Sequence, residues 1–214
     1  MIISNRKKFI FVHNYKVAGS SVTEALAKYD DRSYAQARTW HKLLYSIGVY
    51  PKIYSGQFHF HSKGPELKNK IPEKVFNTYF KFGFVRNPWD WQVSLYNFAI
   101  KWKQHHQHEF IKNMKSFDEY IDWRVNHEVR LQKDFFYDEN GNNLMDFIGK
   151  LENLDTDFKI ICDRIGVIEN LPHVNISNPG KSFVDYYSPK SIDWIAEAFK
   201  EDIELFGYTK PLIR

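Results

Sequence analysis

The chain has 214 residues, which suffices for one domain with a sizeable core and is marginal for two. Hydrophobic residues make up 43% of it and charged residues 26%, the composition of a globular protein rather than a disordered one. The formal net charge of +4 favours an anionic ligand, but it falls short of the concentrated basic stripe of a dedicated nucleic-acid-binding protein, so we expect no nucleic-acid partner.

The first half of the chain predicts strands that alternate with helices. Short runs rich in β-forming residues predict three strands, at residues 9–14, 53–60 and 79–86. Helical spacing predicts a helix after the first and third of these strands, at residues 20–29 and 89–102. Either Ser20 or Ser21 would cap the first helix, and Pro88 precedes the second.

The second half of the chain continues this pattern. Residues 117–131 are typical of an amphipathic helix, and residues 154–166 and 189–205 predict two more helices. Between them, the turn-forming DENGNN at residues 138–143 predicts a hairpin that leads into the strand-like LMDFIGKL. The alternation predicts an α/β domain with a mainly parallel central sheet flanked by helices. Such sheets bind ligands beyond the carboxyl ends of their strands, where both strand-to-helix turns fall.

The first turn, NYKVAGSS at residues 14–21, has the character of an anion-binding loop. It is not a Walker A loop, because its lysine precedes the only glycine. The first N–H groups of the following helix lack a partner within the helix, and the helix dipole favours an anion there. Gly19 would let the backbone approach a phosphate, the two serines would add hydroxyl donors, and Lys16 would add a mobile positive charge. An ordinary capped helix after a strand is the alternative.

The second turn lies in FKFGFVRNPWDWQVSLYNF, residues 80–98. Arg86 ends a predicted strand, and Ser94 follows about two turns into the next helix. An arginine fork and a serine hydroxyl together make a good receptor for a phosphate dianion. A surface arginine and a helix serine without a ligand are the alternative.

Taken together, the two turns resemble those of the sulfotransferases that use 3′-phosphoadenosine 5′-phosphosulfate (PAPS), particularly the carbohydrate-type family. YKVAGSS is similar to the PKTAGTS-like loop that cradles the 5′-phosphosulfate in that family, and FVRNPWDWQVSLY to the FVRNPWDRLVSxY segment that holds the 3′-phosphate. DFIGKLENLDTDF, at residues 146–158, and the closing segment at residues 178–208 also resemble family motifs. The resemblance covers nearly the whole chain.

This resemblance implies a single three-layer P-loop-like domain over residues 1–214. It also implies which residues bind the donor. Those implied for the 5′-phosphosulfate are Lys16, Ala18, Gly19, Ser20 and Ser21. Those implied for the 3′-phosphate are Arg86 and Ser94, with Lys181 as a further candidate for the phosphate or adenine side.

Three positions depart from the family pattern. Tyr15 replaces the usual proline before the lysine, Trp91 replaces the usual arginine after NPWD, and Lys150 stands where arginine is common. Trp91 would remove a positive charge near the nucleotide, which would weaken donor affinity or reshape the acceptor side.

Transfer of a sulfuryl group to a hydroxyl requires a group that accepts the acceptor's proton, and histidine suits this near neutral pH. His59 and His61 fall at the end of the predicted strand 53–60, on one face and about 7 Å apart along it. Similar sulfotransferases carry a catalytic histidine in this region, with His61 the better positional match and His59 the second. Glu66 is the remaining candidate base.

These features predict in-line transfer of a sulfuryl group from PAPS to a hydroxyl or amine acceptor, with Lys16 stabilising the leaving group and no metal required. The resemblance favours a carbohydrate acceptor, and residues 99–140 are expected to set its specificity. The histidines of HHQHEF, at residues 105–110, do not share one helical face as zinc ligands would. The alternatives are an inactive sulfotransferase-like nucleotide-binding module and a P-loop nucleotide kinase.

The cellular location is expected to be cytoplasmic. The single cysteine, Cys162, excludes an intramolecular disulfide. No stretch approaches the roughly 18 apolar residues of a membrane span, and MIISNRKKF has no apolar signal-peptide core.

Overall fold

The computed structural model describes residues 1–32, 54–172 and 182–212. By its internal contacts the chain divides into two compact units, each built from two segments. The first, which we call the sheet unit, comprises Met1–Phe84 and Asp134–Val174. The second, the helical unit, comprises Val85–Lys133 and Asn175–Arg214. That the whole chain forms one domain stays a prediction.

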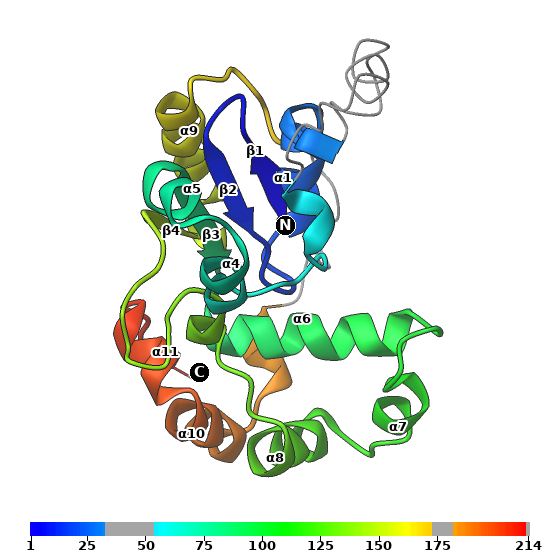
Figure 1. Cartoon of the computed structure of the whole chain (residues 1–214). Helices are drawn as coiled ribbons and strands as arrows, with labels where there is room; N and C mark the ends of the chain where they lie inside the picture. The colour runs from blue at the N-terminus through cyan, green and yellow to red at the C-terminus, as the bar shows by residue number, and fades with distance from the viewer. Residues whose placement is uncertain (33–53, 173–181, 213–214) are drawn as a thin grey trace. The chain divides into compact units, whose positions relative to one another are not determined.

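A four-stranded sheet forms the centre of the sheet unit (Figure 1). Its strands lie in the order β1 (Ile2–Ser4), β2 (Phe9–Val12), β3 (Phe80–Val85) and β4 (Phe147–Lys150). The β1 strand pairs antiparallel with β2, and β2 pairs parallel with β3 in a register that sets Phe9 beside Phe80 and Val12 beside Gly83. The predicted α/β class, with a mostly parallel sheet flanked by helices, is confirmed.

Short helices surround this sheet. They are α1 (Gly19–Leu26), which continues into η1 (Ala27–Tyr29), then η2 (Ser55–Gln57), α4 (Gly64–Lys70), α5 (Glu73–Thr78), η4 (Leu151–Asn153) and α9 (Leu154–Ile165). The η1 turn packs against β1 and α9 packs against β4. The predicted helices at 20–29 and 154–166 are therefore confirmed, whereas β1, α4 and α5 had no counterpart in the sequence prediction.

Aromatic side chains of β2 and β3 form part of the core of the sheet unit. Phe9, Phe11 and Phe82 are fully buried, and the ring centroids of Phe11 and Phe82 lie 5.3 Å apart. Gly83 is required here, because a Cβ at this position would lie 2.3 Å from a ring carbon of Phe136. The residue that pairs with the end of β2 therefore owes its identity to packing.

The predicted strand at 53–60 is wrong over its described residues, 54–60. The chain forms η2 and then turns, with the His59 backbone N–H donating to the Ser62 hydroxyl. Phe58 is buried but Phe60, two positions later, is 46% exposed, so the two rings do not share the one buried face that a strand would give them. The Ser55 hydroxyl, which a strand would have presented to a neighbour, donates instead to Asp30 at 2.8 Å.

The predicted hairpin at 138–143 is confirmed as a tight turn. A bridge pairs Tyr137 with Asn143 in antiparallel fashion, and the Asp138 carboxylate accepts the backbone N–H groups of Asn140 and Asn142. The strand that follows begins only at Phe147, because Asp146 turns its carboxylate to the backbone N–H and ammonium group of Lys81.

The helical unit is built around α6 (Pro88–Lys101), which the sequence predicted at 89–102. Its other helices are α7 (His108–Lys112), α8 (Phe117–His127), η5 (Phe183–Tyr186), α10 (Pro189–Ala198) and α11 (Lys200–Leu205), while η3 (Gln132–Phe135) spans the sequence boundary between the units. The Asn87 side chain caps α6 by accepting the N–H groups of Trp89 and Asp90. Within residues 1–32, 54–172 and 182–212, no helix combines the length and apolar character that a membrane crossing requires.

Candidate functional site

The turn between β2 and α1 has an unusual backbone. Lys16 and Ala18 adopt the left-handed conformation, with φ of 55° and 58°, although neither is glycine. Such residues cost of order 1–3 kcal/mol each and are often retained where a loop must present its backbone to a ligand. The loop is strained in the segment that the sequence marks as anion-binding.

Helix α1 begins directly after this loop, and no side chain caps it. The prediction that Ser20 or Ser21 caps it is wrong, because Ala18 occupies the N-cap and both serines lie inside the first turn. Ser20 is exposed and Ser21 is buried. The first N–H groups of a helix have no acceptor within it, so an eight-residue helix without a side-chain cap suits an anion at this end.

Gly19 owes its identity to a histidine that packs on it. A Cβ at Gly19 would lie 1.7 Å from Nε2 of His13, so only glycine admits this ring. His13 is 3% exposed, and its Nδ1 is buried without a hydrogen-bond partner. Burial, followed by the proximity of His61, lowers the pKa of His13 to about 2. His13 is therefore neutral at physiological pH and forms part of the wall of the turn.

His61 lies against the same turn. Its Nδ1 is 3.0 Å from the backbone carbonyl oxygen of His13. Its ring centroid is 3.9 Å from that of Tyr15 and 4.7 Å from that of His13. Burial lowers the pKa of His61 and outweighs the opposing effect of the hydrogen bond to the His13 carbonyl. A neutral imidazole that donates from Nδ1 carries its lone pair on Nε2, where it can accept a proton.

The other two candidate bases lie differently. His59 is exposed, and because residues 54–60 do not form a strand, the expected common face with His61 is absent. Glu66 lies on α4 and pairs with Lys70 at 2.7 Å. Burial acts to raise the pKa of Glu66, but hydrogen bonds from Lys70 and Ser62 hold it below the usual value. Of the three candidates, His61 is the one whose ring contacts the turn, through the His13 carbonyl and the Tyr15 ring.

Arg86 and Ser94 belong to the helical unit. The guanidinium of Arg86 is buried and binds Asp90 through two contacts, Nε to Oδ2 at 2.6 Å and Nη2 to Oδ1 at 2.8 Å. Its backbone is also fixed, since its N–H donates to the Gln132 side chain and its carbonyl accepts from it. Ser94 is 7% exposed on α6. These partners of Arg86 went unnoticed in the sequence, although the i, i+4 spacing of Asp90 was a usable signal.

A buried carboxylate, that of Asp202, holds the segment that contacts the Arg86 backbone. Asp202, on α11, is fully buried and accepts the backbone N–H groups of Gln132 and Lys133 at 2.7 Å and 2.9 Å. Gln132 in turn holds both backbone polar groups of Arg86. The backbone of Arg86 is therefore tied to α11 through a chain of hydrogen bonds that no local sequence pattern reveals.

Trp91 is a packing residue of the helical unit. It is 1% exposed, and its ring meets that of Phe199 edge-on at 6.4 Å. Its ring is therefore part of the core, and the expected effect of replacing arginine here on donor affinity or on the acceptor side stays a prediction. Lys181 lies outside the described residues.

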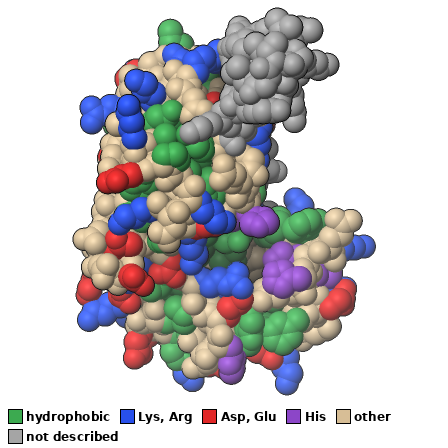
Figure 2. Space-filling view, in the orientation of Figure 1, with side chains coloured by type: hydrophobic (Ala, Val, Ile, Leu, Met, Phe, Trp, Pro, Cys, Tyr) green, Lys and Arg blue, Asp and Glu red, His purple; other side chains and the backbone are tan. Residues whose placement is uncertain are grey.

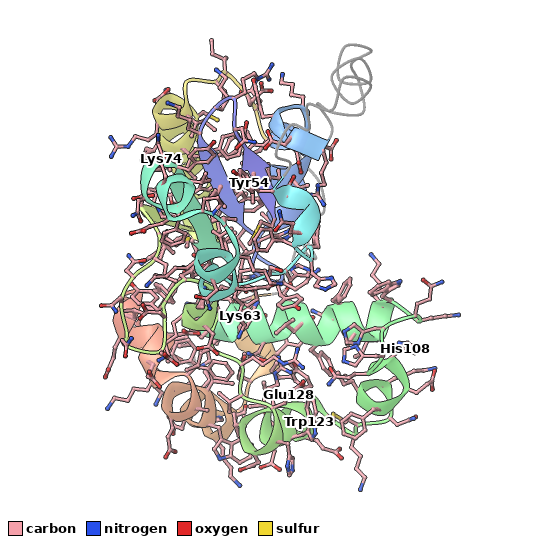
Figure 3. All side chains as sticks on the ribbon, viewed as in Figure 1. Tyr54, Lys63, Lys74, His108, Trp123 and Glu128 are labelled. Atoms are coloured by element: carbon pink, nitrogen blue, oxygen red, sulfur yellow. The ribbon has the colours of Figure 1, made fainter. Side chains whose placement is uncertain are left out.

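Three histidines, at positions 105, 106 and 108, follow one another closely in the helical unit. His108, labelled in Figure 3, is buried, and its Nδ1 lies 2.9 Å from the carbonyl of Ala99. In the described part of the chain, no three or more His, Cys, Asp or Glu side chains are grouped to hold a metal ion. On the face drawn in Figure 2, lysine and arginine side chains are scattered among acidic and neutral ones.

Two comparisons with known proteins found similar sequences. A 113-residue stretch is 29% identical to an uncharacterized protein of Archaeoglobus fulgidus, covering 49% of this chain and 82% of that protein. A family model described as the sulfotransferase family matches residues 1–209, which include both turns. This protein therefore belongs to the sulfotransferase family.

Proposed function

We propose that this protein transfers a sulfuryl group from PAPS to a hydroxyl or amine of a small acceptor, and that the acceptor is a carbohydrate. Membership of the sulfotransferase family supports sulfotransferase activity in general. The observation that carries the finer proposal is the contact between His61 and the strained turn before α1. It combines an anion-binding helix end with a neutral base in one small region of the sheet unit.

The residues of the turn fit the 5′ end of such a donor. The uncapped end of α1 offers backbone N–H groups, and Ser20 offers an exposed hydroxyl. Lys16 is half-buried in the left-handed loop and adds a positive charge. These groups would bind the phosphosulfate without requiring a metal. When bound, the donor supplies an activated sulfuryl group linked to phosphate through a bridging oxygen.

Arg86 and Ser94 are the proposed 3′-phosphate residues. Asp90 holds the guanidinium in a fixed orientation, and Gln132 holds the backbone on which it stands. A fixed arginine loses less conformational entropy on binding a phosphate than a mobile one. Ser94 would add a hydroxyl donor from α6.

His61 would act as the base. Its Nε2 accepts the proton of the acceptor hydroxyl as that oxygen forms its bond to sulfur and the bond from sulfur to the bridging oxygen breaks. Lys16 and the N-terminus of α1 stabilise the negative charge that develops on the bridging oxygen as adenosine 3′,5′-bisphosphate leaves. The acceptor's proton thus ends on His61, the sulfuryl group ends on the acceptor oxygen, and the electron pair of the broken bond stays on the bridging oxygen.

Two measurements test the proposal. Calorimetry should give tighter binding of adenosine 3′,5′-bisphosphate than of AMP, and equal affinities would contradict the role of Arg86 and Ser94. Incubation with sulfur-labelled PAPS and a panel of glycans, lipids and phenols should label a glycan. Selective bisphosphate binding with no labelled product from any acceptor class would instead favour an inactive nucleotide-binding module.

A further inference from the structure

Tyr15 stands at the centre of a small aromatic group in the sheet unit. Its ring lies 3.9 Å from that of His61, with 31° between the planes. The ring of Phe135 meets it from another direction, edge-on at 5.5 Å. Lys63, labelled in Figure 3, lies over the Phe135 ring at 5.6 Å. Tyr15 is thus placed between a buried phenylalanine and the face of His61.

The backbone of Tyr15 is also fixed. Its N–H donates to Oδ1 of Asn14 at 2.7 Å, and Nδ2 of Asn14 donates to the carbonyl of Phe84 near the end of β3. Asn14 is fully buried. The tyrosine ring is therefore held from its own backbone and from Phe135, and it presents a surface of defined position to His61.

The ring of His61 needs such a surface. One hydrogen bond from Nδ1 to the His13 carbonyl fixes a point on the ring but leaves the plane free to tilt about that point. A ring packed against one face removes this freedom. The rings of Phe60 and His13 meet His61 at steeper angles, 87° at 5.0 Å and 60° at 4.7 Å, whereas the Tyr15 ring lies at 31° and 3.9 Å, so Tyr15 covers the face of the imidazole most closely.

We propose that Tyr15 is a positioning residue for His61: its ring holds the imidazole so that Nδ1 stays on the His13 carbonyl and Nε2 remains the proton-accepting nitrogen. The part of this inference that concerns proton acceptance rests on the proposed function. The part that concerns the tautomer does not. Tyr15 stands where the family resemblance leads one to expect proline, which has neither the aromatic ring nor the backbone N–H.

The first test is spectroscopic and uses the full chain without ligand. Protein labelled with ¹⁵N in histidine is observed by two-dimensional NMR, which reports whether Nδ1 or Nε2 carries the proton. The wild type should show His61 protonated at Nδ1. Tyr15→Phe keeps the ring and should give the same signal, whereas Tyr15→Leu should move it toward a mixture of tautomers. Phe60→Leu is the matched control and should leave it unchanged.

The second test is kinetic. Tyr15→Leu should lower kcat about 10- to 100-fold, the loss expected when a catalytic group is misplaced by about 1 Å, while the KM for PAPS stays close to the wild-type value. Tyr15→Phe, which keeps the aromatic ring, should retain a kcat close to that of the wild type. If Tyr15→Leu does not fold, Tyr15→Met, whose unbranched side chain adapts to irregular gaps, is expected to show the same tautomer mixture and the same loss.

The outcomes separate the two proposals. Wild-type tautomer signals in Tyr15→Leu or Tyr15→Met would overturn the positioning role, as would an equal effect of Phe60→Leu. A wild-type protein that shows the Nδ1 tautomer but no sulfuryl transfer would instead contradict the proposed function and leave the role of Tyr15 in fixing the tautomer standing.

Discussion

The Nδ1 of His61 lies 3.0 Å from the carbonyl oxygen of His13, a residue 48 positions earlier in the chain. His13 follows the last residue of β2, and its ring also packs on Gly19 at the start of α1. A single residue at a strand end therefore shapes the turn with its side chain and orients a second histidine with its backbone. The candidate base and the candidate anion site are therefore linked through one residue, His13, within the sheet unit.

His61→Ala should remove most of the turnover while leaving affinity for adenosine 3′,5′-bisphosphate nearly unchanged. Loss of a general base typically costs about 10²- to 10⁴-fold in rate, and no donor contact is assigned to this side chain. Steady-state kinetics with sulfur-labelled PAPS measure the loss. His59→Ala is the matched control, because His59 is exposed two positions away, and it should retain activity. Survival of activity in His61→Ala would move the role to His59 or Glu66.

The two strand-to-helix turns were predictable because each carries strong local signals. Apolar runs mark β2 and β3, and Asn87 with Pro88 forms a helix start that depends on neighbouring residues only. The region 54–60 was not predictable in the same way. The Ser55 hydroxyl, at the start of η2, donates to Asp30, which lies 25 positions earlier in the chain. A contact over this separation cannot be read from a local sequence pattern.

The site was predictable in its residue types but not in its contacts. Gly19 was identified for close approach to a phosphate, yet the structure shows a histidine ring occupying the space beside it. The pattern around Trp91 likewise identified the position but not the direction of its side chain, which depends on how α6 packs on Phe199. Contacts between distant segments decide such questions, and a single sequence does not contain them in readable form.

Arg86→Lys should abolish much of the preference for a 3′-phosphate. Lysine cannot reproduce the two-point contact with Asp90, so its ammonium would not be held in the guanidinium position. Loss of charged hydrogen bonds of this kind costs about 1.5–3 kcal/mol, so the ratio of AMP to bisphosphate Kd should fall about 10- to 100-fold. Calorimetric titration with both nucleotides measures the ratio.

The control for this change is Arg130→Lys. Arg130 is half exposed and pairs with Glu128 in the same helical unit. Its replacement should leave both Kd values unchanged. An Arg86→Lys protein that still prefers the bisphosphate by the wild-type factor would exclude Arg86 as the residue that recognises the 3′-phosphate.

Gly19→Ala should destabilise the protein, because the new methyl group would lie 1.7 Å from Nε2 of His13 and 2.0 Å from its Cδ2. His13 is buried and cannot swing into solvent, so the ring and the turn must both shift. Overpacking of this kind costs about 1–3 kcal/mol. Chemical denaturation measures the free energy of unfolding. Gly56→Ala, where nothing lies within 4 Å of the new carbon, should show no comparable loss. Equal stability of the two variants would mean that His13 does not occupy this position.

His13 should make the fold sensitive to acid. Its pKa in the folded protein is about 2, against 6.5 for an unperturbed histidine, because burial and the neighbouring His61 disfavour its charged form. The unfolded chain therefore binds a proton below about pH 6.5 that the folded chain refuses, and this difference stabilises the unfolded state as the pH falls. The contribution amounts to at most about 1.4 kcal/mol per pH unit and is absent above the unfolded pKa.

His13→Gln, which has no titrating group, should show a shallower loss of unfolding free energy between pH 6.5 and pH 4 in denaturation series. The backbone carbonyl that orients His61 remains in this variant, so the substitution removes the titrating ring of His13 and keeps that hydrogen bond. Parallel curves for the two proteins would show that His13 takes up its proton in the folded state as easily as in the unfolded chain.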